Sequence, residues 1–439
     1  MIFGDGAAAA LVGAGSPVAT LVAHHGVHAD LVDHFRATGE DHDYGWEERW
    51  VRDEGYLKIA VDALRERYIR ALDEATCVVL GGTLTTGDTT SVIEVRSSTA
   101  GGGGANATIT NGFTNTGLIE LRTLDAFYGN SLTVTTGTLL NAPTGIIRAV
   151  PGFGSKGLTA VLNNQGLLDV REALTLSRAS AAHTNSGTID LALGDLTVTQ
   201  SGTTPSFTNT GTITVPAGRT LTVSGGSLNL SSGVLNGQAG TLVTTGVTLD
   251  LTMATSRTRL TLNSTTVPGT FTIPAGDSLR LTNGSPTMTL VNNGRLVLQG
   301  SPVLNGTLTT GDTTSVIEVR SSTAGGGGAN ATITNGFTNT GLIELRTLDA
   351  FYGNSLTVTT GTLLNAPTGI IRAVTGFGSK GLTAVLNNQG LLDVREALTL
   401  SRASAAHTNS GTIDLAAGDL TVTQTGTTPS FTNTGTITV

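Results

Sequence analysis

The sequence has little of what most globular enzymes are built from. Its 439 residues include one cysteine and two tryptophans, with only 4% aromatic and 13% charged residues. A single cysteine excludes an intramolecular disulfide, and so few aromatic residues disfavour a large compact core. No run is long and apolar enough to cross a membrane as a helix. The chain is instead rich in glycine, with 59 residues set among Thr, Ser, Asn, Val and Leu, which is typical of many short strands joined by turns.

Charge is concentrated at the start of the chain. Residues 1–79 hold 14 of the 32 acidic and 7 of the 24 basic residues, a net charge of −7, so the remaining 360 residues carry −1. Both tryptophans, five of the seven histidines and the cysteine also precede residue 80. This break predicts two unrelated segments, 1–79 and 80–439. The second segment is nearly neutral and has no basic stripe, so we expect no nucleic-acid partner.

The strongest feature is a long internal repeat. Residues 79–215 recur at 303–439, a shift of 224 positions. Four positions differ between the two blocks: Gly81 and Asn305, Pro151 and Thr375, Leu193 and Ala417, and Ser201 and Thr425. A long block copied almost intact indicates stacked modules that lengthen a scaffold, because stacking adds length without new chemistry.

A shorter phrase returns inside each block, usually Asn-x-Gly with aliphatic residues two and four places after the glycine. In the first block the glycines are Gly117, Gly145, Gly166, Gly187 and Gly211, with spacings of 28, 21, 21 and 24 residues. Alternation with period 2 predicts strands with one buried face, and the spacing fits one coil of a parallel β-solenoid. The residues expected to point inward are Ile119, Leu121, Leu168, Val170, Ile189, Leu191, Ile213 and Val215. Related phrases at Pro216-Ala-Gly218 and Pro274-Ala-Gly276 predict further coils over 216–302.

The asparagine two places before four of these glycines, all except Gly145, also has a structural interpretation. In a stack of coils the same turn position recurs about every 4.8 Å, so aligned amides can form a hydrogen-bonded ladder. We expect this ladder at Asn115, Asn164, Asn185 and Asn209 and at their copies Asn339, Asn388, Asn409 and Asn433. The alternative is that exposed amides bind a ligand. We expect the glycine to supply a positive φ for the turn.

Built on Asn-x-Gly-x-Ile and Pro-Ala-Gly-x-x-Leu coils, residues 80–439 resemble repetitive bacterial surface proteins, namely autotransporter passengers and filamentous-haemagglutinin-like adhesins. The resemblance implies a mainly β fold, a right-handed parallel β-helix, and a location at the cell surface or outside the cell. It also implies attachment as a function, and it transfers no binding site. The sequence opens Met1-Ile-Phe-Gly-Asp5, without a visible signal peptide.

Residues 1–79 resemble a fragment of a different family. The stretch Phe3-Gly-Asp5-Gly6-Ala, with His34-Phe-Arg36 and a helix-like segment over 55–72, is similar to ketoacyl-synthase III and hydroxymethylglutaryl-CoA synthase, which are thiolase-fold enzymes. The resemblance implies a small α/β fragment. Those enzymes need a cysteine nucleophile with His and Asn or Glu partners. Cys77 matches no nucleophile position, so we expect no acyl transfer, no catalytic residues and no cofactor.

Two groups of polar residues have competing interpretations. His24, His25 and His28 suggest a metal site, but zinc needs three or four converging ligands, so we expect solvated histidines and no metal. On the solenoid, Glu120, Arg148 and Asp169 fall at the same outward position of successive coils. They form either a charge ladder or part of a carbohydrate-cleaving site, and we expect the ladder.

One loop groups a carboxylate with aromatic residues in a chain that has few of them. It contains Asp125, Phe127 and Tyr128, and its copy contains Asp349, Phe351 and Tyr352. Two identical patches on a rod could bind a repetitive ligand by avidity. The alternative is that these aromatic residues cover the edge of the core.

We therefore expect a non-catalytic structural or adhesive segment of a bacterial surface or secreted repeat protein. The alternative is a carbohydrate-binding or carbohydrate-active β-helix, and a third hypothesis is an inactive thiolase-type remnant. The expected partners are a host or matrix glycan or protein, or other copies joined through the solenoid ends. The chain begins inside the enzyme-like motif and ends where the first block continues with Pro216, so we expect it to belong to a longer protein.

Overall fold

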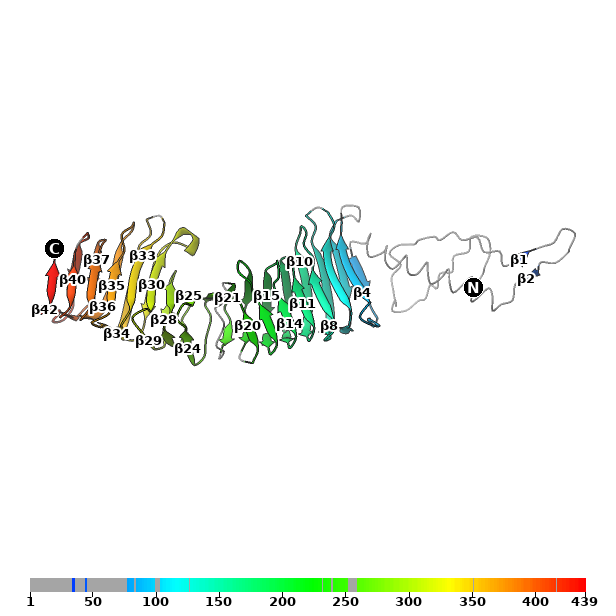
Figure 1. Ribbon diagram of the computed structural model, residues 1–439, viewed down its shortest axis with the longest axis horizontal. Helices are drawn as coiled ribbons and strands as arrows, with labels where there is room; N and C mark the ends of the chain where they lie inside the picture. Colours follow the sequence, from blue (N-terminus) through cyan, green and yellow to red (C-terminus); the bar gives the residue numbers. More distant parts are fainter. Residues whose placement is uncertain are drawn as a thin grey trace.

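The structure, a computed structural model, is a parallel β-solenoid of about 14 turns with almost no helix (Figure 1). The mainly β, parallel β-helix prediction is therefore confirmed. The structure describes residues 34–35, 44–45, 77–82, 84–98, 103–125, 127–230, 232–237, 240–251, 259–349, 351–415 and 417–439. His24, His25 and His28 lie outside these residues. So does most of the predicted thiolase-like fragment 1–79, apart from an antiparallel pair of β1 (His34–Phe35) and β2 (Tyr44–Gly45) and the start of the solenoid strand β3 (Cys77–Leu80).

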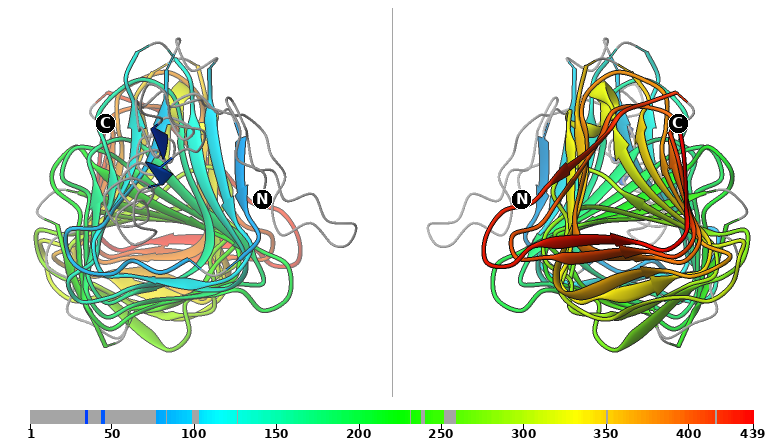
Figure 2. Two further views of the ribbon diagram at one scale, coloured as in Figure 1. Left: turned by 90° about the vertical axis from the view of Figure 1, so that its right-hand side faces the viewer. Right: turned by 90° about the vertical axis from the view of Figure 1, so that its left-hand side faces the viewer.

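Each coil contributes up to three strands, one to each side of a triangular rod (Figure 2). In the first block the side called here the first sheet contains β4 (Val92–Ser97), β7 (Leu118–Thr123), β9 (Ile146–Ala149), β11 (Leu167–Val170), β14 (Thr188–Asp190), β17 (Thr212–Thr214) and β20 (Val234–Asn236). The third side contains β6 (Phe113–Asn115), the second parts of β8 (Asn130–Asn141) and β10 (Lys156–Asn164), then β13 (Ala182–Asn185), β16 (Ser206–Asn209), β19 (Ser227–Asn229) and β22 (Thr248–Asp250).

The second sheet runs through both blocks. It begins with β3 (Cys77–Leu80), β5 (Ala105–Ile109), the first parts of β8 and β10, β12 (Leu174–Ala179), β15 (Leu196–Ser201), β18 (Thr220–Ser224) and β21 (Thr241–Thr245). It continues through β23 (Arg259–Asn263), β25 (Ser278–Asn283), β27 (Arg295–Leu298), β30 (Val316–Ser321), β33 (Leu342–Thr347), β35 (Ile370–Ala373), β37 (Leu391–Val394), β40 (Thr412–Asp414) and β43 (Thr436–Thr438).

The other two sides of the second block are built in the same way. One carries β28 (Val303–Leu304), β31 (Ala329–Ile333), β34 (Asn354–Asn365), β36 (Lys380–Asn388), β38 (Leu398–Ser401) and β41 (Leu420–Thr423). The other begins with β24 (Thr270–Ile273), β26 (Thr289–Asn292) and β29 (Leu308–Thr310) and includes β32 (Phe337–Asn339), β39 (Ala406–Asn409) and β42 (Ser430–Asn433). The helical turn η2 (Thr323–Gly325) follows β30.

The core consists of columns of aliphatic side chains, because in-register stacking places each inward residue on its counterpart in the next coil. Ile119, Ile147, Leu168, Ile189 and Ile213 form one such column. All eight residues predicted to point inward are buried, with at most 1% of their surface exposed. Each fully buried aliphatic side chain contributes roughly 1.5–3 kcal/mol relative to an exposed one. The column extends over every coil of the block, so coils depend on their neighbours for burial.

The role expected for the turn glycines was wrong. Gly166, Gly187 and Gly211 are absent from the residues with positive φ, whereas Gly218 and Gly276 of the Pro-Ala-Gly turns have φ of 78° and 84°. The turn glycines are required instead by close approach of neighbouring coils. A Cβ on Gly187 would lie 2.2 Å from the carbonyl oxygen of Gly166, and a Cβ on Gly211 would lie 2.1 Å from that of Gly187. Only a residue without a side chain fits there.

The two blocks are offset by one side of the triangle. In the first block β4 and β7 belong to the first sheet. Their copies β30 and β33 belong to the second sheet, where β30 stacks on β27 and β33 stacks on β30. The rod also twists along its axis, as parallel stacks do. As a result, the corner that follows β7 and the corner that follows β33 both lie along the upper edge of Figure 1, and both parts meet at the upper corner in Figure 2.

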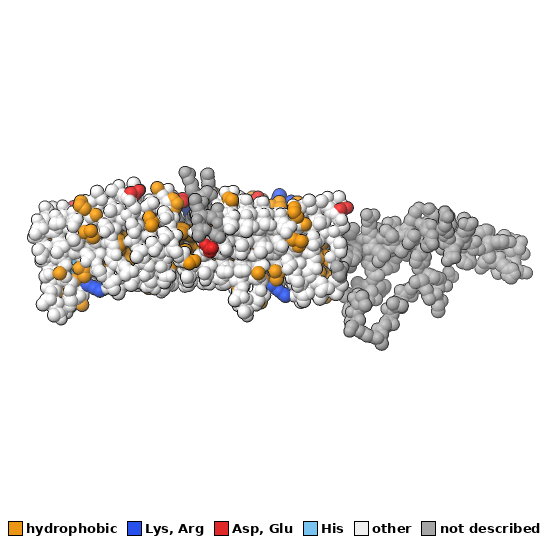
Figure 3. Space-filling view, turned by 90° about the horizontal axis from the view of Figure 1, so that it is seen from below, with side chains coloured by type: hydrophobic (Ala, Val, Ile, Leu, Met, Phe, Trp, Pro, Cys, Tyr) orange, Lys and Arg blue, Asp and Glu red, His pale blue; other side chains and the backbone are white. Residues whose placement is uncertain are grey.

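The surface of the rod is polar and mostly uncharged. In Figure 3 the visible face of the described residues is largely white, with scattered apolar and charged side chains. All four positions that differ between the blocks are exposed in both copies. The buried residues of the repeat are thus the same in both copies, which follows if the core tolerates less change than the surface.

Candidate functional site

The asparagines lie in a continuous ladder along one corner of each block. In the first block the Nδ2 of each side chain donates to the Oδ1 of the next, from Asn115 through Asn141, Asn164 and Asn185 to Asn209, at 2.8, 2.7, 2.6 and 2.6 Å. In the second block the ladder runs through Asn339, Asn365, Asn388, Asn409 and Asn433, at 2.8, 2.7, 2.7 and 2.6 Å. The ladder is buried, apart from its last rung at Asn433, so its amides are engaged with one another.

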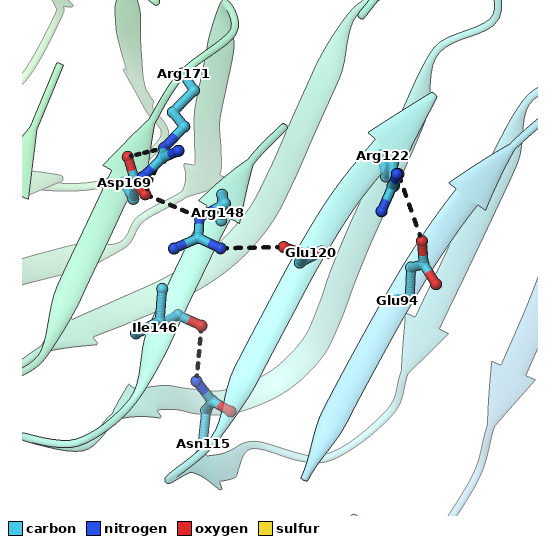
Figure 4. Close-up of polar contacts among 8 residues, drawn as sticks. All are labelled: Glu94, Asn115, Glu120, Arg122, Ile146, Arg148, Asp169 and Arg171. Carbon is cyan, nitrogen blue, oxygen red and sulfur yellow. Dashed lines mark hydrogen bonds and ion pairs between the residues drawn. The ribbon is translucent and has the colours of Figure 1, made fainter. Parts of the chain in front are cut away.

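Asn141 and Asn365 are rungs that the sequence pattern missed. Asn141 stands four residues before Gly145, whereas the other asparagines of its block stand two residues before their glycines. The available signal was the phrase Leu140-Asn141, which aligns with Asn163-Asn164 once β8 pairs with β10. Each rung also donates to backbone carbonyls; Asn115, for example, donates to Ile146 O at 3.2 Å (Figure 4).

Removing one rung tests what the ladder contributes. Asn164→Ala removes the acceptor of the Asn141 amide and leaves the buried Oδ1 of Asn185 without its donor. We expect the free energy of unfolding to fall by about 2 kcal/mol, because an unsatisfied buried polar group costs about 1–3 kcal/mol. The shift in urea midpoint measures this loss. Asn111→Ala is the control, because Asn111 is exposed and donates a long 3.4 Å bond to Gly82 O; an equal loss in both variants would contradict the prediction.

The outward charged residues of the first sheet form an ion-pair ladder (Figure 4). Arg148 lies between two carboxylates, with Nε 2.8 Å from Asp169 Oδ2 and Nη1 3.3 Å from Glu120 Oε1. Arg171 approaches the same Asp169 oxygen at 2.9 Å. The Asp169 side chain is 4% exposed beneath these two arginines. Both carboxylates that could have served as a catalytic acid and base are therefore held by guanidinium groups.

The carboxyl pKa of one repeated glutamate, Glu94 in the first block and Glu318 in the second, shifts in opposite directions in the two blocks. At Glu318, burial raises the carboxyl pKa, but hydrogen bonds from Arg320 and Arg295 outweigh burial and the net pKa is lowered. At its copy Glu94, burial raises the pKa and the nearest arginine nitrogens are 3.9 Å away. The difference arises because Glu318 stacks on β27, which supplies Arg295. Ionisation of Glu318 therefore stabilises the fold above its ordinary pKa, and that stability is lost as the pH falls.

The predicted ligand loops project from the corner after β7 and after β33. Phe127 is 81% exposed and its copy Phe351 is 79% exposed, so these rings do not cover the core. Tyr128 and Tyr352 are about half as exposed as these phenylalanines. Asp349 accepts hydrogen bonds from Thr323 N and Thr323 Oγ1, at 2.5 and 2.9 Å, and so holds the adjacent turn η2.

A second aromatic residue from the next coil completes each patch. Phe153 lies against Phe127 with ring centroids 4.8 Å apart and an interplanar angle of 54°, and Phe377 lies against Phe351 at 4.7 Å and 56°. Tilted pairs at this distance are favourable. The aromatic patch of the first block is defined here as Leu124, Phe127, Tyr128 and Phe153, and that of the second block as Leu348, Phe351, Tyr352 and Phe377. Sequence reasoning missed Phe153 and Phe377, because 26 positions separate each from its partner.

Two features are absent from the described residues. No group of three or more His, Cys, Asp or Glu side chains among them is placed to hold a metal ion. Within the same ranges no helix is long and apolar enough to span a membrane.

Comparisons with known proteins find similarity among solved structures only. No protein-family model matches the chain, and no curated protein matches it in sequence. Among solved structures, the TibC-catalysed hyper-glycosylated TibA55-350 fragment is similar, with 12% identity and a TM-score of 0.22, over 83% of this chain and 99% of that one. At that identity and TM-score the likeness says nothing about what this chain does. The resemblance of residues 1–79 to thiolase-fold enzymes has no support from these comparisons.

Proposed function

We propose that the chain is a non-catalytic structural and adhesive segment of a bacterial surface or secreted protein. The observation that carries the proposal is the pair of aromatic patches on an otherwise polar rod. The side chains of Phe127 and Phe153 are exposed to solvent and do not contribute to packing of the core. Both residues recur unchanged in the second block. Exposed apolar clusters of this kind mark interaction sites. The β-solenoid fold and the surface-protein resemblance of the repeats support the same function.

The arrangement of the patches favours a multivalent contact. At a strand spacing of about 4.8 Å, the coils between β7 and β33 place the patches roughly 50 Å apart. Both patches follow corners on the same side of the rod, because the twist offsets the one-side shift between the blocks (Figure 1). A surface that presents many identical groups can therefore engage both patches at once. Such a second contact raises apparent affinity by about 10²–10⁴.

Serine substitution of the phenylalanines tests this proposal. Three variants are needed: Phe127→Ser with Phe153→Ser, Phe351→Ser with Phe377→Ser, and all four changes together. We expect the fourfold variant to lose binding to an immobilised panel of glycans and matrix glycoproteins. Each twofold variant is expected to bind about 10²-fold more weakly. Biosensor measurements at low ligand density and far-UV circular dichroism give affinity and folding.

Val234→Ser is the matched control, because Val234 is exposed on the rod outside both patches. This variant is expected to bind like the unchanged chain. Binding that survives in the fourfold variant would overturn the adhesive proposal. Equal affinity of the unchanged chain and both twofold variants would leave adhesion standing but remove the multivalent contact.

Carbohydrate binding is a second candidate. It is favoured by the pair of tilted phenyl rings with an adjacent tyrosine, because aromatic rings supply rigid apolar surface with a polar edge at Tyr128. Binding is favoured over cleavage, because Glu120 and Asp169 are engaged by Arg148 while hydrolysis needs a free acid and base. Incubation with linear polysaccharides should give saturable binding that the fourfold variant lacks, and no new reducing ends. Release of reducing ends would contradict the non-catalytic proposal.

A further inference from the structure

A buried lysine interrupts the core beside each aromatic patch. One inward column of the second sheet stacks Ala105, Asn130, Lys156, Leu174 and Leu196 in register. Lys156 is 1% exposed, as is its copy Lys380. Leucine occupies this column in the following coils, so the site accepts an aliphatic side chain. Burying an ammonium costs far more than burying a leucine, which calls for a reason other than packing.

The ammonium of Lys156 makes three hydrogen bonds, and two of them reach the loop of Phe153. Nζ donates to Thr123 Oγ1 at 2.6 Å, to Phe153 O at 2.9 Å and to Gly154 O at 3.2 Å. Lys380 repeats the pattern with Thr347 Oγ1, Phe377 O and Gly378 O, at 2.9, 2.8 and 3.0 Å. An ammonium has three donors, so all of them are used in each copy.

The same network reaches the other half of the patch. Thr123 Oγ1 donates to Tyr128 O at 3.1 Å, and Asn130 Nδ2 donates to Thr123 Oγ1 at 3.2 Å. The Lys156 ammonium is thus joined directly to the loop of Phe153 and, through one hydroxyl, to the loop of Phe127 and Tyr128. Burial lowers the pKa of Lys156, opposed by the charge of Glu172. Charge-assisted bonds inside a protein are stronger than neutral ones, so this contact restrains both loops.

We infer that Lys156 and Lys380 are positioning residues that hold the two phenylalanines of each aromatic patch in a fixed arrangement at the expense of core stability. Fixing the loops before a partner arrives lowers the ordering cost of binding. The consequence for binding rests on the proposed function, whereas the consequence for loop order does not. The two parts can therefore be tested separately.

Lys156→Leu separates positioning from stability. Leucine fits the column and removes the buried charge, and replacement of a buried charge by a packed apolar group is often neutral or stabilising. We expect the thermal midpoint to stay the same or rise. Amide hydrogen exchange in a peptide spanning residues 150–158 is expected to quicken at least about tenfold, because the loop loses its restraint.

The second block is the control inside the same molecule. Peptides spanning 374–382 differ in mass from those spanning 150–158, because Thr375 replaces Pro151. Their exchange should not change in the Lys156→Leu variant, and Lys380→Leu should give the reciprocal result. Unchanged exchange in both loops would overturn the inference. Faster exchange throughout the strands with a lower midpoint would also overturn it, since that result means a general structural role.

Binding provides the second readout. If the unchanged chain binds an immobilised glycan or glycoprotein through its patches, Lys156→Leu should weaken that binding as much as Phe127→Ser with Phe153→Ser does. Full binding by Lys156→Leu with a loosened loop would overturn the link between loop order and recognition. If the unchanged chain binds nothing, the proposed function fails, while the exchange measurement still decides whether the lysines position the loops.

Discussion

Gly187→Ala is expected to lower the free energy of unfolding by at least about 3 kcal/mol, near the upper end of what overpacking costs. The added Cβ would lie 2.2 Å from Gly166 O and 2.5 Å from both C and O of Gln165. All three contacts are with backbone atoms, so no side chain can move aside. The two coils would have to separate, which disturbs the nearest-neighbour contact on which a solenoid depends.

Alanine substitutions at two other glycines distinguish the steric cost of this contact from the usual cost of replacing glycine by alanine. Gly218→Ala meets no atom within 4 Å but requires a φ of 78°, so we expect a loss of about 1–2 kcal/mol. Gly87→Ala has open space and no positive φ, so its stability should change by less than about 0.5 kcal/mol. Urea midpoints of the three variants should follow this order. A Gly187→Ala midpoint equal to that of Gly87→Ala would show that the coils are less tightly stacked than described.

Acid is expected to destabilise the solenoid as the pH falls from about 6.5 to about 4, because two histidines are buried in the core. Burial lowers the pKa of His183 from 6.5 to about 4 and also lowers that of His407. Each Nδ1 accepts a backbone N–H, from Leu162 and Leu386 respectively, at 3.2 Å. Each Nε2 is buried without a partner. Because Nδ1 is the acceptor in the neutral ring, protonation would place a second N–H on Nδ1, opposite the backbone N–H that it now accepts from, and would add a buried charge without a partner.

The direction of the pH effect follows from proton linkage. The unfolded histidine binds a proton below about pH 6.5, while folded His183 resists protonation until about pH 4. The unfolded state therefore holds more protons in this window, and stability falls as the pH drops from 6.5 to 4. For His183 the loss is about 3 kcal/mol. His407 adds a loss in the same direction.

A variant that keeps the hydrogen bond but cannot titrate isolates this effect. His183→Asn places an amide oxygen near the position of Nδ1, so the Leu162 N–H keeps an acceptor. Urea midpoints at pH 7 and pH 4.8 should differ less in this variant than in the unchanged chain. Glu318 and Asp393 have lowered pKa values, so their titration falls below this range. An identical pH dependence in both proteins would contradict the assignment to His183.

Local sequence patterns predicted the parts of the fold that depend on local geometry. The alternation at Ile119-Glu-Leu121 specifies a strand with one buried face whatever the coil stacks against, and both residues are fully buried. Asparagine at a fixed place in each phrase likewise indicated aligned amides, because a periodic sequence in a periodic stack aligns like with like. Asn141 was not predicted in this way, because two more residues separate it from its glycine than separate the other asparagines from theirs.

Features that arise between coils were not predictable in the same way. The glycine column was assigned to a positive φ, yet its cause is a carbonyl oxygen about 21 residues away in the sequence. Phe153 pairs with Phe127 only after β8 and β10 are in register. No local sequence feature predicts that Lys156 is buried in the core, since its strand begins Lys-Gly-Leu-Thr-Ala. Its three acceptors are the hydroxyl of Thr123 at the end of β7 and the carbonyls of Phe153 and Gly154 in the loop before β10, which stacking brings together.

The sequence by itself determined that this chain is a solenoid built from duplicated coils, because strand period, coil length and the 224-residue shift are all spacings between residues in the linear sequence. Only the tertiary structure decided how the duplicates are oriented. Strands of the first sheet in the first block have their copies in the second sheet in the second block. The twist of the rod then places the loops of both blocks on the same side (Figure 2). Register and twist accumulate over the whole stack, so no single coil encodes the direction in which the aromatic patches point.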